Sequence, residues 1–287
     1  MTDALKLKLE DVLKAKLVSV DELSGGDISK AYRVGLSHSK YFFVKSNSAT
    51  LAFDMFKKER LGLTTLARKG TIKVPACQAV FTHEGTSVII LDYIESKSEN
   101  QSDLKLFGKE LAALHEPLKY SFGFSSDNYI GTLPQYNNKY QNWCQFYIEQ
   151  RLEPQFKLAY NHRLLMKEDI PTTERLEVVL NATLSTERPS LLHGDLWSGN
   201  YLINKDGTPF LIDPAVYYGD KIIDIAMSQL FGGFGKAFYE SYFYWTSQPK
   251  LLKERIELYQ LYYLLVHLNL FGISYYPKVK RICRNYF

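Results

Sequence analysis

The sequence predicts an α+β protein of two lobes, a small β-rich N-terminal lobe at residues 1–94 and a larger, mainly helical C-terminal lobe at residues 95–287. Length is the first reason, because a chain of 287 residues is longer than most domains built on a single core. The second reason is a change of pattern after Ile94, from short strand-like segments to amphipathic helical spacing. The third is a β-hairpin with polar flanks that interrupts the helical part.

Strands and one helix are expected in the N-terminal lobe. Segments rich in β-branched and aromatic residues predict strands at residues 16–20, 32–36, 41–45 and 87–94. Apolar side chains recur at helical spacing over residues 51–68, which predicts a helix between the last two strands. Gly70 and Pro75 follow this segment, and both residue types are typical of the end of a helix.

Helices dominate the C-terminal lobe. Residues 95–102 are polar and turn-forming, as expected for a connection between two lobes. Helical spacing then predicts helices at residues 104–114, 140–151, 172–184 and 250–270. The hairpin is predicted at residues 201–204 and 210–213, because the Asp206-Gly207 pair between them is a favoured turn sequence.

Composition limits the class of protein. Hydrophobic residues make up 46% of the chain and charged residues 23%, as in soluble globular proteins. The net charge of +4 is not concentrated in a long basic run, so we expect neither nucleic acid nor a membrane surface as a partner. The three cysteines lie far apart and predict neither a disulfide framework nor a zinc site. No signal-like or bilayer-spanning apolar segment is found, so the expected compartment is the reducing cytoplasm, and the oligomeric state stays open.

Polar residues flank the predicted hairpin at a spacing that suits phosphoryl transfer. Asp195 and Asn200 precede the first strand, and Asp213 closes the second strand, thirteen residues after Asn200. Phosphoryl transfer from ATP needs a carboxylate to orient the acceptor hydroxyl, and oxygen ligands that hold Mg²⁺ against the phosphates. In protein kinases a loop Asp, an Asn five residues further on and a later Asp supply these groups. We therefore predict a protein-kinase-like fold with Asp195 as the catalytic base and Asn200 and Asp213 as Mg²⁺ ligands, while His193 is expected to brace the loop.

The N-terminal lobe is expected to bind the nucleotide. Lys45 ends an apolar strand, so its ammonium group would reach the phosphates of ATP. Glu59 lies on the following predicted helix, where it would pair with Lys45 and fix its position. Gly25 and Gly26 fall between two predicted strands and would offer backbone N–H groups to the phosphates, although Asp27 sets a negative charge beside them.

The last strand of this lobe ends in Leu91, Asp92 and Tyr93, which are the expected hinge. Adenine would be bound there through backbone groups, so the residue types themselves carry little information.

The motif around the hairpin resembles the fructosamine (ketosamine) kinase family. Its most specific part is His193-Gly194-Asp195-Leu196-Trp197-Ser198-Gly199-Asn200, because broader relatives share only the His-Gly-Asp and the Asn. Further similar stretches are Phe43-Val44-Lys45, Leu111-Ala112-Ala113-Leu114-His115, Asn128-Tyr129-Ile130-Gly131, Ile212-Asp213-Pro214-Ala215 and Asp224-Ile225-Ala226-Met227. The resemblance covers nearly the whole chain, and it groups the sequence with the aminoglycoside and choline kinases in the protein-kinase-like superfamily.

The resemblance implies a kinase that uses ATP and Mg²⁺ to phosphorylate the sugar 3-hydroxyl of ketosamines, free or protein-bound, as a deglycation step. Asp195 carries over as proton acceptor, Asn200 and Asp213 as Mg²⁺ ligands, and Lys45 with Glu59 as the nucleotide pair. The matching Asp224 is expected to tie down the catalytic loop by accepting backbone N–H bonds.

Acceptor contacts are expected from residues near the loop and from one polar, aromatic stretch. Trp197 lies within the catalytic loop, where its ring would stack on the acceptor sugar. The stretch suited to hydroxyl recognition contributes the further candidates Asn128, Gln135, Asn137 and Trp143.

Two other functions remain open from the sequence. A kinase of another small alcohol, such as an aminoglycoside or choline, would share the catalytic residues, but the Trp197-Ser198 insert argues against it. A catalytically silent binding module with a kinase fold would usually have lost a metal ligand or the base, and here all three positions are present.

Overall fold

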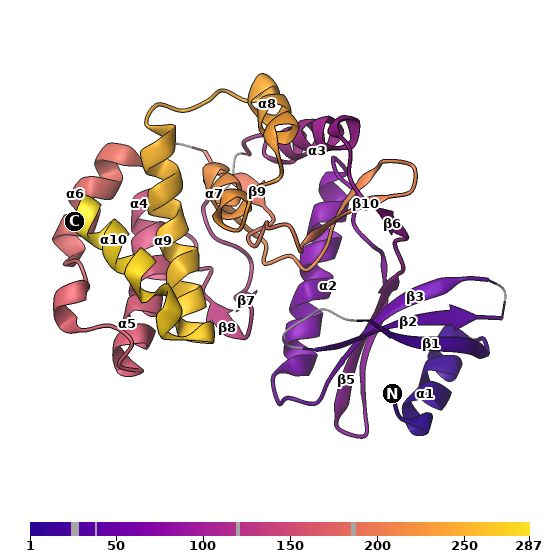
Figure 1. Ribbon diagram of the computed structural model, residues 1–287. Coiled ribbons are helices and arrows are strands. Elements are labelled where there is room, and N and C mark those ends of the chain that lie inside the picture. Colours follow the sequence, from indigo (N-terminus) through magenta and orange to yellow (C-terminus); the bar gives the residue numbers. More distant parts are fainter. Residues whose placement is uncertain (24–28, 38, 119–120, 185–187) are drawn as a thin grey trace. The chain divides into compact units, whose positions relative to one another are not determined.

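The computed structural model describes residues 1–23, 29–37, 39–118, 121–184 and 188–287 (Figure 1). Contacts between Cα atoms divide the chain into two units. Unit 1 contains residues 1–98 and 202–213, and unit 2 contains residues 99–201 and 214–287. The division falls a few residues after the boundary at 94/95 that we predict for the lobes, and it groups the hairpin with unit 1.

Unit 1 is built on a five-stranded antiparallel sheet with the strand order β1-β2-β3-β5-β4 (Figure 1). The strands are β1 (Leu17–Leu23), β2 (Lys30–Leu36), β3 (Tyr41–Asn47), β4 (Cys77–His83) and β5 (Thr86–Asp92). The four predicted strands correspond to β1, β2, β3 and β5, whereas β4 was missed. Its pattern was hidden because most of its side chains are only half-buried and its apolar residues do not form a long run.

Helices cover both faces of this sheet, which explains the continuous apolar run in β5. Val88 and Ile90 pack in one cluster with Leu5 and Leu9 of α1 (Asp3–Leu13), a helix that the sequence analysis missed. The alternate residues Ile89 and Leu91 pack in a second cluster with Phe56 and Leu63 of α2 (Ala52–Lys69). Helix α2 was predicted, and it ends as expected at Gly70, whose φ of 72° is the left-handed conformation that glycine readily adopts.

The hairpin was predicted correctly and pairs with unit 1. Its strands are β10 (Tyr201–Asn204) and β11 (Pro209–Leu211), and β10 also pairs with the short β6 (Ser96–Lys97). An isolated bridge joins Lys73 to Phe210. These pairings explain why the hairpin groups with residues 1–98, although it follows about a hundred residues of unit 2.

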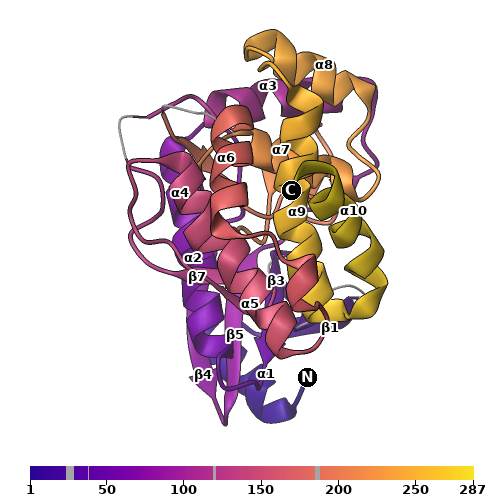
Figure 2. The same cartoon turned by 90° about the vertical axis from the view of Figure 1, so that its left-hand side faces the viewer.

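Unit 2 is mainly helical (Figure 2). Its helices are α3 (Gln101–Leu114), α4 (Trp143–Tyr147), the π-helix η1 (Ile148–Leu152), α5 (Glu153–Asn161), η2 (Lys167–Asp169), α6 (Thr173–Thr183), α7 (Ile222–Leu230), α8 (Lys236–Trp245), α9 (Leu252–Phe271), η3 (Ile273–Tyr275) and α10 (Tyr276–Tyr286). Two short strand pairs complete it, β7 (Asn128–Ile130) with β8 (Leu133–Gln135) and β9 (Ser190–Leu192) with β12 (Tyr217–Gly219). Helix α9 contacts α5, α7 and α10, so it forms the centre of the unit.

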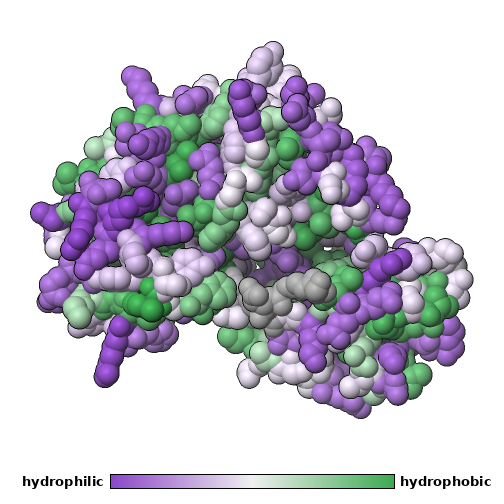
Figure 3. Space-filling model, viewed as in Figure 1, coloured by the Kyte–Doolittle hydropathy of each residue, from purple (hydrophilic) through white to green (hydrophobic). Residues whose placement is uncertain are grey.

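The surface carries both polar and apolar residues, as the mixed composition of the chain leads us to expect. Figure 3 shows hydrophilic and hydrophobic residues interspersed on one face of the molecule. Among the described residues, no helix is both long enough and apolar enough to cross a bilayer.

Candidate active site

The predicted catalytic loop, residues 193–200, lies between β9 and β10. Strand β9 brings the chain to the loop from the interior of unit 2, and its residues Ser190, Leu191 and Leu192 are all buried. Its antiparallel partner β12 pairs Tyr217 with Leu192, which fixes the point where the loop begins.

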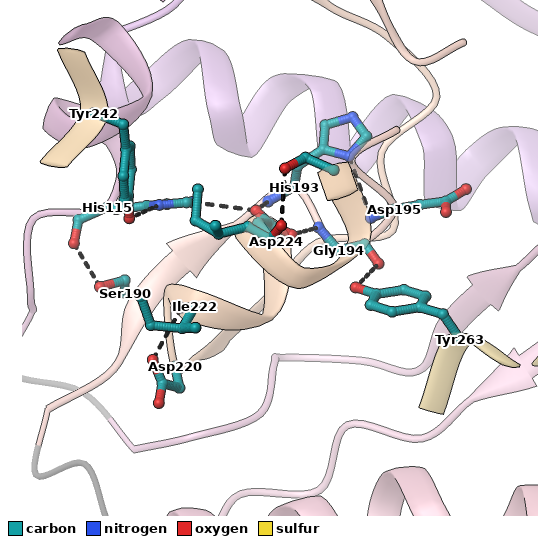
Figure 4. Close-up of polar contacts among 12 residues, drawn as sticks. His115, Ser190, His193, Gly194, Asp195, Asp220, Ile222, Asp224, Tyr242 and Tyr263 are labelled. Carbon is teal, nitrogen blue, oxygen red and sulfur yellow. Dashed lines mark hydrogen bonds and ion pairs between the residues drawn. The ribbon is translucent and has the colours of Figure 1, made fainter. Parts of the chain in front are cut away.

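Asp224 on α7 holds the start of the loop. Its Oδ2 accepts a hydrogen bond from the backbone N–H of His193 at 2.7 Å, and its Oδ1 accepts one from Gly194 N–H at 2.9 Å (Figure 4). The Asp224 side chain is fully buried, and hydrogen bonds to an ionised acceptor are among the strong ones. This geometry is the backbone support that we predict for Asp224.

Asp224 is itself held by a buried pair that the sequence analysis did not assign. His115, the C-cap of α3, lies with Nε2 at 3.2 Å from Asp224 Oδ2 and with Nδ1 at 2.8 Å from the hydroxyl of Tyr242 on α8 (Figure 4). An ionised carboxylate only accepts hydrogen bonds, so Nε2 donates to Asp224. The loop is thereby connected to two helices besides α7.

His193 braces the loop, in agreement with its predicted structural role. Its ring Nδ1 accepts the backbone N–H of Asp195 at 3.2 Å, and its carbonyl accepts Ala215 N–H at 2.9 Å. The His193 side chain is fully buried.

Asn200, which we predict as a Mg²⁺ ligand, also contacts Asp195. The Asn200 Nδ2 donates to the backbone carbonyl of Asp195 at 2.8 Å and to its Oδ2 at 3.1 Å. Asn200 is buried, and its own backbone N–H donates to the Trp197 carbonyl at 2.9 Å, which closes the loop into a tight turn. Because the amide nitrogen is directed at Asp195, the amide oxygen is the atom that would bind a cation.

Lys45, Glu59 and Asp213 meet in unit 1. Lys45 Nζ lies 2.9 Å from Glu59 Oε1, and it also forms an ion pair with Asp213 Oδ1. Lys45 comes from β3, Glu59 from α2, and Asp213 lies just after β11. Asp213 has a φ of 53°, the left-handed region that side-chain-bearing residues rarely adopt, with Asp and Asn among the more tolerant.

Burial and charge shape the ionisation of this cluster. Burial lowers the pKa of Lys45, but the charges of Asp213 and Glu59 and hydrogen bonds to both outweigh that effect and raise it. Burial raises the pKa of Glu59 to about 7, and the Lys45 charge opposes this rise. A lysine with two carboxylate neighbours stays a cation, as required for contact with phosphate groups.

The predicted hinge residues lie at the end of β5. Leu91 is buried against α2, Asp92 Oδ1 accepts a hydrogen bond from Gln78 Nε2 at 2.8 Å, and the Arg33 guanidinium lies 5.3 Å from the Tyr93 ring centre. The predicted glycine-loop residues Gly25 and Gly26 lie outside the described residues.

Four of the five predicted acceptor residues lie inside unit 2, and this placement does not support direct contact with a substrate. Asn128, Gln135, Asn137 and Trp143 are all between 1% and 6% exposed. Gln135 Nε2 donates to Asn128 Oδ1 at 2.7 Å and to the Ala215 carbonyl at 3.0 Å, and Asn128 Nδ2 donates to the Val216 carbonyl at 2.8 Å. Their polar atoms therefore hold the segment that follows Asp213.

A buried arginine, which no sequence pattern singled out, completes this network. Arg151 on the π-helix η1 is fully buried, donates from Nη2 to Asn137 Oδ1 at 2.7 Å and lies 4.0 Å from the Tyr217 ring centre. Trp143 belongs to a neighbouring contact, where its Nε1 donates to the Tyr259 hydroxyl at 2.7 Å. The aromatic and amide residues of this stretch thus serve packing.

Of the five residues predicted to contact the acceptor, Trp197 is the one with an exposed side chain. Its side chain is 38% exposed, and its ring lies over Gly199, where an added Cβ would come within 2.4 Å of the ring. A row of rings continues from it in the same unit: Phe231 at 6.5 Å from Trp197, His267 at 4.7 Å from Phe231, and Tyr275 at 5.2 Å from His267. Such a row offers apolar faces beside the catalytic loop.

The residues present fit a hard divalent cation by donor type, since Asn200 and Asp213 offer amide and carboxylate oxygens. A site made of protein ligands alone is not indicated, because the described parts of the chain hold no cluster of three or more His, Cys, Asp or Glu suited to a metal. Magnesium ions bound by one or two protein oxygens and by nucleotide phosphates need no such cluster.

Comparisons with known proteins agree with one another over nearly the whole chain. The family model for fructosamine kinase matches residues 1–287. A relative named "Probable ketoamine kinase" from Lactiplantibacillus plantarum is 38% identical over 269 residues, which cover 93% of this chain and 94% of the relative. A "Protein-ribulosamine 3-kinase, chloroplastic" from Arabidopsis thaliana is 35% identical over 279 residues, which cover 94% of this chain and 83% of the relative.

Solved structures confirm the predicted fold. The crystal structure of a "Putative fructosamine-3-kinase" from Haemophilus somnus 129PT has a TM-score of 0.87 at 26% identity and covers 99% of this chain and 97% of that one. A macrolide 2′-phosphotransferase from Brachybacterium faecium has a TM-score of 0.61 at 12% identity, covers 99% of this chain and 97% of that one, and shows a shared fold alone.

Proposed function

The chain belongs to the fructosamine kinase family, and from that premise we propose that it transfers the γ-phosphoryl group of ATP to a sugar hydroxyl of ketosamines. Membership confirms the predicted class of enzyme, a phosphotransferase with an alcohol group as acceptor. The observation that carries the finer proposal is the pairing of Asp195 with Asn200 in a loop whose backbone is held by Asp224.

Asp195 is the proposed catalytic base. Its carboxylate orients the attacking sugar hydroxyl and accepts its proton as the phosphoryl group is transferred. Asn200 restricts the rotation of this carboxylate through the hydrogen bond to Oδ2. Phosphoryl transfer depends mainly on positioning and on electrostatic stabilisation, so a rigid loop is the main contribution of this part of the protein.

ATP and Mg²⁺ are the proposed cofactors. Lys45 binds the phosphates, and Glu59 holds its ammonium group at 2.9 Å. We propose the oxygens of Asn200 and Asp213 as protein ligands of Mg²⁺, on the basis of their motif and their donor type. Bound Mg²⁺ neutralises charge that develops on the phosphate oxygens.

Trp197 is the proposed contact for the sugar of the acceptor. An exposed indole beside the catalytic loop suits stacking against the apolar face of a sugar ring. The 3-hydroxyl as phosphorylation site, the choice between free and protein-bound ketosamines and the link to deglycation are proposals that the family suggests. We also propose a reducing cytoplasmic compartment, on the ground that Cys77, Cys144 and Cys283 are free thiols.

A substrate panel tests the function. Purified protein is incubated with ATP, Mg²⁺ and a ribulosamine, an erythrulosamine or a fructosamine, and ADP and the phosphorylated sugar are measured together. We expect phosphorylation of at least one ketosamine, and we expect Asp195→Asn to lower kcat by about 10²- to 10⁴-fold while nucleotide binding persists.

The same panel also tests the two alternative functions, a kinase of another small alcohol and a silent binding module. Choline and an aminoglycoside serve as acceptors that lack the ketosamine group, and phosphorylation of either one in preference to every ketosamine would overturn the proposal. Nucleotide-dependent thermal stabilisation without ADP formation on any acceptor would instead identify a silent binding module. An Asp195→Asn variant with near-normal kcat would remove Asp195 from the base role.

A further inference from the structure

The peptide bond between Gly194 and Asp195 has no orientation imposed by local sterics. Gly194 has a φ of 85°, a region that glycine enters without the penalty that other residues meet. Glycine also leaves the neighbouring peptide planes free to rotate, because it has no Cβ that would clash with them. The orientation of this peptide determines where the Asp195 side chain leaves the backbone. Hydrogen bonds must therefore fix it.

Glycine is nevertheless required at this position. A Cβ added to Gly194 would come within 2.0 Å of the Ala215 carbonyl oxygen, far inside any real contact distance. The close approach is part of the loop's own pairing, in which the Ala215 N–H donates to the His193 carbonyl at 2.9 Å. A glycine, with its flexible backbone, therefore stands directly before the proposed base because no residue with a side chain fits there.

Both ends of the Gly194–Asp195 peptide are held by buried side chains. The hydroxyl of Tyr263 donates to the Gly194 carbonyl at 2.9 Å, and the Asp195 N–H donates to His193 Nδ1 at 3.2 Å. Tyr263 lies on α9, the central helix of unit 2, and is fully buried. Figure 4 shows Tyr263 and Asp224 reaching the loop from different sides.

The Tyr263 hydroxyl is suited to the role of a permanent donor. Burial raises the pKa of Tyr263 well above its ordinary value, so the O–H stays protonated across the working pH range. The Tyr263 side chain is fully buried, and the ring centre of the adjacent Tyr262 is 5.1 Å away. A carbonyl that loses such a donor pays a desolvation cost, and the peptide then keeps only its bond to His193.

We propose that Tyr263 is a positioning residue for Asp195, which it aims by fixing the orientation of the Gly194–Asp195 peptide. The proposal rests on the function proposed above for Asp195. It adds to the proposed site a residue that lies 69 positions from Gly194 in the chain. The helix that carries Tyr263 contributes no group that reacts.

Tyr263→Phe tests the proposal, and Tyr147→Phe is its matched control. Tyr147 is also a fully buried tyrosine that donates to a backbone carbonyl, that of Leu258, at 2.9 Å, but its bond lies away from the loop. Both variants lose one buried O–H donor to a backbone carbonyl, so a loss of melting temperature is expected in each. For Tyr263→Phe we expect kcat to fall by about 10- to 100-fold, as for a small misplacement of a reacting group, with an unchanged KM for ATP. For Tyr147→Phe we expect kcat near that of the wild type.

A second measurement does not depend on turnover. Hydrogen exchange of backbone amides in peptides that span residues 193–196 should be faster in Tyr263→Phe than in the wild type and in Tyr147→Phe. Equal kcat values in the two variants, or unchanged exchange in the loop of Tyr263→Phe, would overturn the proposal. A wild type that is inactive on every ketosamine would refute the proposed function instead, and the exchange result would still decide whether Tyr263 holds the loop.

Discussion

Lys45 and Glu59 form an ion pair across β3 and α2, with 2.9 Å between Nζ and Oε1 and with only 13% of each side chain exposed. The contact that we predict from a strand-end lysine and a carboxylate on the next helix is therefore formed. It is more buried than an ordinary surface pair, and Asp213 provides Lys45 with a second anionic partner.

Glu59→Gln should impair catalysis more than stability. Lys45 keeps its ion pair with Asp213 in the variant, so no buried charge is left alone and the free energy of unfolding should change by only about 1 kcal/mol. The position of the ammonium group should become less defined, and kcat/KM for ATP should fall at least about 10-fold. Steady-state kinetics and a melting curve on the same preparation measure both effects. Asp54→Asn, which removes an exposed carboxylate of the same helix, is the control and should change neither quantity. A large loss of stability with intact specific activity would make Glu59 a structural brace.

Asp213→Asn should abolish the stabilisation that Mg²⁺ adds to nucleotide binding. Asn tolerates the left-handed backbone conformation at this position as Asp does, so the substitution removes the charge without the strain that Ala would add. Nucleotide at 100 times its Kd stabilises a protein by about 2.7 kcal/mol, which a melting experiment resolves easily. Asp206→Asn in the hairpin turn is the matched control and should retain the full Mg²⁺-dependent shift. A shift of wild-type size in Asp213→Asn would exclude Asp213 as the main ligand.

Gln135→Leu should destabilise the protein without changing the KM of the acceptor. Gln135 is 1% exposed and makes three buried hydrogen bonds, including one at 2.9 Å from the Tyr262 hydroxyl to its Oε1. Loss of these partners should cost about 2–4 kcal/mol of unfolding free energy, since the groups left behind are buried. Gln145→Leu removes an exposed hydrogen bond to Glu149 and should stay within about 0.5 kcal/mol. A rise in acceptor KM at unchanged stability would restore Gln135 as a substrate contact.

His267→Asn should make stability less dependent on pH below neutrality. Burial lowers the pKa of His267 from 6.5, and its Nδ1 lies 2.7 Å from the Tyr263 carbonyl. The unfolded chain therefore takes up a proton near pH 6.5 that the folded protein resists, so wild-type stability falls as pH decreases below that value. Asn retains a donor for the carbonyl but does not titrate. Chemical denaturation at pH 7.5, 6.5 and 5.5 should show a decline that is smaller in the variant by up to about 1 kcal/mol per pH unit. Equal slopes for the two proteins would contradict the lowered pKa.

The sequence was sufficient to predict the local elements that carry the proposed catalytic and nucleotide-binding residues. The order of Lys45, Glu59, Asp195, Asn200 and Asp213 reflects a local strand, helix or loop in each case, and periodicity and motif spacing report such local structure. The hairpin between Asn200 and Asp213 was predictable for the same reason, since its turn is encoded by Asp206-Gly207.

Contacts between distant segments were not predictable. The hydroxyl of Tyr242 reaches His115 across 127 positions, and nothing in the residue type distinguishes it from the other 20 tyrosines. The same limit applies to Asn128, Gln135 and Asn137, whose polarity suggested contact with a ligand and which the structure places in a buried network. A buried hydrogen-bond network satisfies polar groups equally well.

The hairpin has a consequence for how the protein can be divided experimentally. Unit 1 is discontinuous, because residues 202–213 join it only after the chain has passed through residues 99–201. A fragment that ends at Ser98 would lack the partner strand of β6 and the Asp213 carboxylate that pairs with Lys45. No single cut in the chain can therefore separate the two units intact. A soluble N-terminal fragment would require residues 202–213 to be grafted onto it through an artificial linker or supplied as a separate peptide.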